Sequence, residues 1–124
     1  MTLIDTNVLV DYLRGHPKAV EFLEGLERPF RVSVVTSAEL LAGARTSGEE
    51  EALQAFVATL MELSVGPDIA HRAGQFCARF RGSHGVGLAD ALIAATAECH
   101  GLALATLNRR HFPMLQEVTV PYAP

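Results

Sequence analysis

Short apolar runs alternate with amphipathic stretches along the chain, as strands alternate with helices in α/β proteins. Residues 2–5, 31–35 and 102–106 are predicted strands because each is a short apolar run. A shorter edge strand is expected at 117–121, where Pro121 closes it. Strands that alternate with helices predict an α/β fold with a central parallel sheet and helices on both faces.

The spacing of apolar residues predicts six helices, over residues 7–14, 17–26, 36–44, 49–63, 67–81 and 85–99. Pro17 suits the first turn of the second helix, and Gly101 ends the sixth. A brief strand is expected at 64–65.

The helix over 49–63 is predicted to begin at a capping box formed by Ser47 and Glu50. Its apolar residues occupy most of its faces, so it is expected to be largely buried: Leu53, Phe56, Val57, Leu60 and Met61. This helix and the one over 18–26 are also the expected source of apolar surface that a partner chain would cover.

The helix over 85–99 carries one charge among apolar neighbours. Asp90 shares its helical face with Val86, Ile93, Ala94 and Ala97, and the opposite stripe is also apolar. An ionised carboxylate in such surroundings needs a partner, or it takes up a proton. The sequence therefore raises the question of what Asp90 faces.

Two further acids occupy matching places, since Asp5 ends the first strand and Glu39 opens the helix after the second. Each acid could simply favour a helix N-terminus, and Thr36 with Glu39 has the spacing of a capping box. In a doubly wound sheet, however, helices that follow strands begin at one edge, where ligands bind. Asp90 joins that edge if the helical segment over 49–81 returns the chain to it.

Convergence of these carboxylates would have an electrostatic cost. Two of them about 4 Å apart repel by roughly 4 kcal/mol at an effective dielectric constant near 20. They would hold either protons or a cation, and hard oxygen ligands suit Mg²⁺ or Mn²⁺. Such an ion can ionise water and neutralise charge on a phosphate, so the pattern favours a phosphodiester hydrolase. Thr106 and Asn108, at the end of the last long strand, could add oxygens there or serve only in a turn.

The formal net charge of −4 argues by itself against a nucleic-acid partner. Nine of the ten basic residues are arginine, and four of these form two short clusters: Arg79, Arg81, Arg109 and Arg110. These clusters could contact phosphates or form a solvated surface.

Hydrophobic residues make up 49% of the chain, which suggests that another chain covers some apolar surface. No apolar run is long enough for a membrane span, and residues 1–10 do not resemble a signal peptide. Cys77 and Cys99 are therefore expected to be reduced thiols in a cytoplasmic protein.

Four segments, "LIDTNVLVDYL", "SAELLAG", "LADALIAATA" and "LATLNRRHF", resemble in order and spacing the motifs of PIN-domain ribonucleases, most closely the VapC-type toxins. The resemblance covers essentially the whole chain, so a single PIN domain over 1–124 is expected. It implies a Rossmann-like α/β/α sandwich and cleavage of RNA that depends on Mg²⁺ or Mn²⁺. It also implies homodimerisation and inhibition by a cognate VapB-like antitoxin, whose C-terminal segment covers the site.

The resemblance also assigns roles. Asp5 and Asp90 would be direct metal ligands, and Glu39 would orient water or a second ion. The supporting polar residues would be Thr6, Asn7, Thr106 and Asn108.

The chain departs from the family pattern in its last motif, where many members carry a fourth acid. Here Asn108 is neutral and His111 precedes Phe112. The alternative is therefore a catalytically silent PIN-like module that binds protein or RNA. His111 could contact RNA, act in proton transfer or be structural. The glycines of the predicted loop over 81–87 could let an RNA backbone approach, or the loop could be only a flexible connection.

Overall fold

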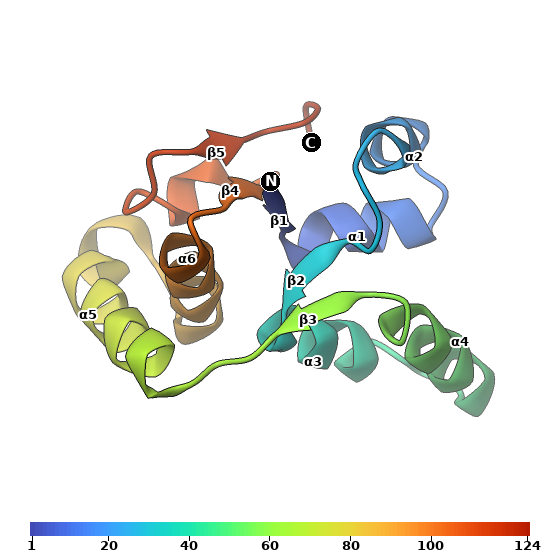
Figure 1. The fold of residues 1–124 in the computed structure, drawn as a ribbon, viewed down its shortest axis with the longest axis horizontal. Coiled ribbons are helices and arrows are strands. Elements are labelled where there is room, and N and C mark those ends of the chain that lie inside the picture. The colour runs from blue at the N-terminus through green and yellow to red at the C-terminus, as the bar shows by residue number, and fades with distance from the viewer.

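The computed structural model describes residues 1–124, and its centre is a sheet of five parallel strands in the order β3-β2-β1-β4-β5 (Figure 1). The strands are β1 (Thr2–Ile4), β2 (Arg31–Ser33), β3 (Met61–Leu63), β4 (Ala103–Ala105) and β5 (Val118–Thr119). The expected parallel sheet is therefore confirmed, and β1, β2, β4 and β5 are each shorter than the predicted strand.

Six α-helices and one short 3₁₀ helix connect the strands. They are α1 (Thr6–Leu13), α2 (Pro17–Glu24), α3 (Val34–Ala42), α4 (Ser47–Val57), α5 (Pro67–His84), α6 (Leu88–His100) and the 3₁₀ helix η1 (Arg109–His111). Figure 1 shows α5 and α6 on one side of the strands, with α1, α2 and α4 on the other.

Two separate hydrophobic cores hold these layers, and β1 contributes to both. Leu3 packs in the core with α5 and α6, whereas Ile4 packs in the core with α1, α2 and Val32. Successive side chains of a strand point to opposite faces, so two adjacent apolar residues bind both layers to the central strand. Leu3 is fully buried and Ile4 is 1% exposed.

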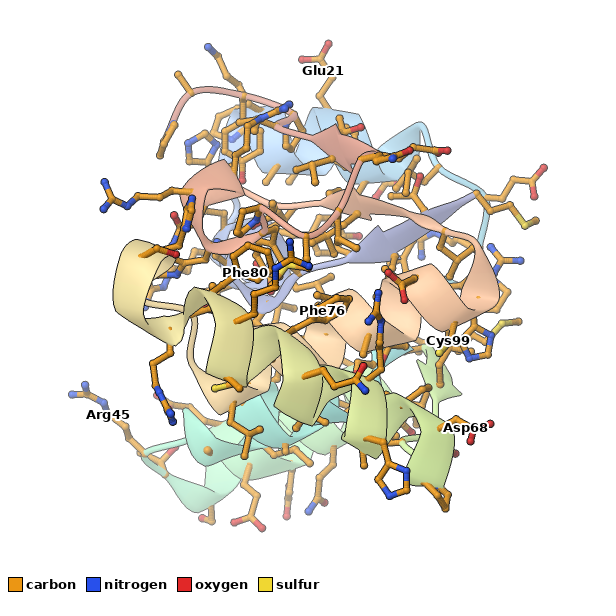
Figure 2. All side chains as sticks on the ribbon, turned by 90° about the vertical axis from the view of Figure 1, so that its left-hand side faces the viewer. Glu21, Arg45, Asp68, Phe76, Phe80 and Cys99 are labelled. Atoms are coloured by element: carbon orange, nitrogen blue, oxygen red, sulfur yellow. The ribbon has the colours of Figure 1, made fainter.

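Most of helix α6 is buried in the first core, but the expected burial nearly all round the helix is wrong, because Leu88 is 61% exposed and Cys99 is also exposed at its two ends. Val86, Ile93, Ala94 and Ala97 are all buried, and small side chains let α5 pack closely against α6. Figure 2 views the molecule from the α5 side and shows Phe76 pointing from α5 into this layer, while Arg45 and Asp68 lie at the periphery. Asp90 is therefore presented from a rigid helix.

The order of the strands reverses beside β1. From β1 the chain steps to β2 and β3 on one side, and it then crosses to β4 and β5 on the other. In open parallel sheets, ligands bind at the carboxyl ends of the strands where the order reverses. That point lies between the ends of β1 and β4, which are followed by Asp5 and Thr106.

The boundary between β2 and α3 lies earlier than the sequence pattern predicts. The apolar run continues to Val35, but the strand ends at Ser33, whose hydroxyl accepts a hydrogen bond from the Val35 backbone N–H at 3.1 Å. Ser33 is therefore the N-cap. The alternative interpretation of Thr36 with Glu39 as a capping box is wrong, because Thr36 already lies inside the helix.

The predicted helix over 49–63 is also corrected. Helix α4 ends at Val57, and residues 61–63 form β3 instead, earlier than the brief strand expected at 64–65. Thr46, rather than Ser47, caps the helix by accepting a hydrogen bond from the Glu49 N–H. The expected burial is wrong as well, since Val57 is the only buried residue of α4.

Near the carboxyl edge, α5 continues to His84 where a loop over 81–87 was expected. Gly85, with φ +65°, then ends the helix in the left-handed region, which glycine adopts without strain. The remaining connection to α6 is therefore short. None of the helices has both the length and the apolar character that crossing a bilayer requires.

Replacing the cap of α3 tests the observed boundary. Ser33→Ala leaves the Val35 N–H without its partner, so we expect the free energy of unfolding to fall by about 1 kcal/mol in urea denaturation. Ser64→Ala, at an exposed residue between β3 and α5, is the matched control and should change little. Equal stability of both variants would contradict a helix start at Ser33.

Candidate active site

Asp5 lies at the carboxyl end of the central strand and is 5% exposed. Its backbone N–H still donates to the Ala105 carbonyl at 2.9 Å, which fixes it beside β4. Its Oδ1 accepts from the Thr6 backbone N–H at 2.8 Å, and its Oδ2 accepts from the Thr106 hydroxyl at 2.7 Å. Asp5 is thus the N-cap of α1 and also the centre of a buried polar network.

Glu39 reaches the same edge from α3. The Thr6 hydroxyl donates to Glu39 Oε1 at 2.6 Å, and the buried Thr36 hydroxyl oxygen lies 3.1 Å from that of Thr6. The carboxylates of Asp5 and Glu39 are therefore both hydrogen-bonded to Thr6, the first residue of α1.

Asp90 lies in the first turn of α6, where its Oδ2 is 3.1 Å from Nδ1 of His111. The same ring nitrogen is 2.8 Å from Nδ2 of Asn108. Both side chains of the pair are partly exposed, at 29% for Asp90 and 35% for His111. Within the chain, the partner of Asp90 is His111.

The other predicted polar residues stabilise the end of β4. The Asn108 N–H donates to the Thr106 hydroxyl oxygen at 3.0 Å, and the Leu107 N–H lies 3.4 Å from Asn7 Oδ1. Every predicted site residue thus lies in one network or directly beside it. Their roles in catalysis stay predictions.

The electrostatics of this edge are those of crowded acids. Burial raises the pKa of Asp5 to about 6, and the charges of Asp90 and Glu39 add to the rise, while bonds from Thr106 and Thr6 oppose it. Burial also raises the pKa of Asp90, against the lowering effect of His111. A cation at this edge would lower both pKa values.

The acids share one edge but do not touch. No three His, Cys, Asp or Glu side chains are close enough to hold a metal ion together. An ion here would therefore have one or two protein carboxylates and complete its shell with water or substrate oxygens, as Mg²⁺ commonly does. All three acids are hard oxygen donors, so the donor set fits Mg²⁺ or Mn²⁺.

Two of the four clustered arginines have partners within the chain. Arg109 Nη2 donates to the Val118 carbonyl at 2.9 Å, and the Arg79 guanidinium lies over the Phe80 ring, 5.2 Å from its centroid. Arg81 and Arg110 are exposed and form no ion pair. These two remain the better candidates for phosphate contacts.

The sequence matches the PIN domain family over residues 2–117. The chain belongs to the PIN-domain family. This PIN domain is 41% identical to ribonuclease VapC10 of Mycobacterium tuberculosis over 99% of its own length and 94% of the relative. It is 43% identical to ribonuclease VapC19 of the same species, over 98% of its own length and 100% of the relative.

Two solved structures share the fold of this PIN domain. A toxin–antitoxin complex from Klebsiella pneumoniae contains a chain with a TM-score of 0.84 and 31% identity, aligned over 100% of both chains. FitAcB from Neisseria gonorrhoeae contains one with a TM-score of 0.78 and 28% identity, aligned over 98% of both. The resemblance to VapC-type PIN domains is thereby confirmed.

Sequence reasoning did not identify the contact of His111 with Asp90. The signal available was the spacing of Asn108 and His111 in a turn, which places both side chains on one side of η1. A turn was one of the two interpretations of Thr106 and Asn108, but nothing in the sequence linked that turn to a residue at the start of α6.

The elevated pKa of Asp5 makes stability depend on pH. Because the folded-state pKa of about 6 exceeds the ordinary 3.8, protonated Asp5 favours folding, and this contribution is lost as pH rises through 6. Asp5→Asn cannot ionise. From melting temperatures in EDTA, we expect the stability of Asp5→Asn relative to the parent to increase by about 1 kcal/mol between pH 5 and pH 8.

The matched control is Asp68→Asn, which removes an exposed acid at the far end of α5. It corrects for the loss of one negative charge. If the melting temperatures of Asp5→Asn and the parent changed with pH in the same way across this range, the pKa of Asp5 would not be raised in the folded state.

Proposed function

We propose that this PIN domain is an endoribonuclease that depends on Mg²⁺ or Mn²⁺ and is the toxin of a type II toxin–antitoxin pair. The observation that carries the proposal is the meeting of Asp5, Asp90 and Glu39 at the strand-order reversal, with Asp5 buried and its pKa raised. Full-length similarity to two VapC ribonucleases supports RNA as the substrate class.

In this proposal, Asp5 and Asp90 hold the ion, and Glu39 orients water or a second ion. The ion, when bound, would lower the pKa of water and neutralise charge that develops on the phosphate. Thr6 and Thr106 fix the carboxylates of Glu39 and Asp5 by hydrogen bonds, so both acids are oriented before substrate arrives. The exposed Arg81 and Arg110 would bind flanking phosphates.

The cleavage assay uses single-stranded or looped RNA with and without divalent ions. We expect excess EDTA to abolish cleavage, and Asp5→Asn or Asp90→Asn to lower the rate roughly 100-fold or more, because each removes a proposed ligand. Asp68→Asn should retain the parent rate. The parent and both site variants should first be shown to be folded.

Two outcomes would reject the proposal. Undiminished cleavage in EDTA would exclude the metal. Absence of cleavage, together with a melting temperature that Mn²⁺ does not raise, would favour the catalytically silent module instead.

We further propose that the antitoxin covers this edge through an adjoining groove of about 540 Å³ between α1, α3 and α4. Five hydrophobic side chains contribute to its lining, and Glu39 lies within it: Val10, Leu13, Leu40, Ala52 and Leu53. A segment seated there would therefore reach the acids. The matching chain in the Klebsiella structure comes from a toxin–antitoxin complex, which supports such a partner. Homodimerisation stays a prediction.

Leu13 is 41% exposed in this groove, so a charge there should disturb binding without disturbing the fold. We expect Leu13→Asp to weaken inhibition by the cognate antitoxin at least about tenfold and to leave RNA cleavage unchanged. Met61→Asp, at a residue 38% exposed on β3, is the control. Equal inhibition of both variants would place the antitoxin elsewhere.

A further inference from the structure

Three polar side chains converge between the first turn of α6 and η1. Nδ1 of His111 lies 3.1 Å from Oδ2 of Asp90 and 2.8 Å from Nδ2 of Asn108. This group adds a nitrogen and an amide to the potential ligands at the carboxyl edge, where the three acids alone are not close enough to hold an ion.

The hydrogen-bonding groups of these side chains do not match as placed. With its proton on Nδ1, the imidazole donates to Asp90 but turns an N–H toward the Asn108 amide donor. With its proton on Nε2, it accepts from Asn108 but directs a lone pair at the Asp90 carboxylate.

Turning the Asn108 amide exchanges its nitrogen and oxygen, which have nearly the same shape. His111 Nδ1, Asp90 Oδ2 and Asn108 Oδ1 are then three adjacent acceptors. Two groups can satisfy them: a proton on Nδ1, or a metal ion.

The separations of His111 Nδ1 from Asp90 Oδ2 and from the terminal amide of Asn108 suit an ion. Adjacent ligands of an octahedral ion with bonds of about 2.1 Å lie about 3.0 Å apart. The observed separations of 3.1 and 2.8 Å bracket that value. His111 is also held in place, because Phe112 beside it is 2% exposed and Arg109 is bonded to the Val118 carbonyl.

We propose that His111 Nδ1 is a direct ligand of a divalent ion that also binds Asp90 Oδ2 and Asn108 Oδ1, and that it makes the site prefer Mn²⁺ over Mg²⁺. Asp5 would contact this ion through a water or substrate oxygen, because no three acid or histidine side chains lie close enough to bind one ion together. Imidazole nitrogen binds first-row transition metals well, whereas Mg²⁺ prefers oxygen ligands. The neutral ring would bind with its proton on Nε2. The inference rests on the proposed metal dependence and deepens it, because a nitrogen ligand occupies the motif that lacks a fourth acid.

The alternative role for His111 is that of a positioning residue, which donates a hydrogen bond to Asp90 and never touches the ion. Loss of either role would weaken metal binding, since outer partners of ligands commonly contribute about 10- to 100-fold to affinity. The test must therefore detect the metal–nitrogen bond or the selectivity between ions.

Pulsed electron paramagnetic resonance on the full chain loaded with Mn²⁺ detects the bond directly. We expect the parent to show ¹⁴N coupling from a coordinated imidazole, and His111→Gln to lose it. His71→Gln, at an exposed histidine on α5, should keep the coupling. Circular dichroism and melting curves check folding, and His111→Asn is a second variant if His111→Gln does not fold.

Calorimetric titration with Mn²⁺ and with Mg²⁺ gives the selectivity. We expect His111→Gln to weaken Mn²⁺ binding at least about tenfold more than Mg²⁺ binding. Equal losses for both ions, or bound Mn²⁺ without ¹⁴N coupling in the parent, would overturn the inference and leave the proposed function standing. No Mn²⁺ or Mg²⁺ binding by the parent, with RNA cleavage that persists in EDTA, would overturn both.

Discussion

The burial of one carboxylate constrains the rest of this molecule. Asp5 follows the central strand, where removal from water and two neighbouring acids favour its protonated form. The folded chain opposes that tendency with two donors, the Thr6 N–H and the Thr106 hydroxyl. These donors are in place only because α1 begins at residue 6 and β4 ends beside β1. The start of the helix and the pairing of the strands therefore both stabilise the carboxylate of Asp5.

The same arrangement explains why the stability of the fold and the ability to attract a cation oppose one another at this edge. A neutral residue at position 5 would satisfy the buried network with less electrostatic strain, but it would remove the charge that attracts a cation. Two cores on opposite faces of β1 supply the compensating stability, because Leu3 and Ile4 bind both helical layers to the strand that carries Asp5. The repulsion thus acts next to residues that are packed in both cores.

Much of the fold and of the acidic edge follows from local pattern. Alternating strands and helices predict the parallel sheet. A single carboxylate, that of Asp90, on an otherwise apolar helix predicts that this side chain has a polar partner. The exceptions depend on tertiary contacts. Residues 61–63 pair with β2 although Met61 is exposed, so helical periodicity continues through them without a visible break. The contact of His111 with Asp90 joins residues 21 positions apart through a turn whose Asn108 and Arg109 have no periodic signal.

The bond between Thr106 and Asp5 spans 101 residues, and β4 pairs with β1 only after most of the chain exists. A polypeptide still emerging from the ribosome therefore carries Asp5, Glu39 and Asp90 without the strand that orients the first of them. Abortive translation products that stop before β4 would lack an assembled edge. The order of elements along the chain thus means that the acidic edge is assembled only when synthesis is nearly finished.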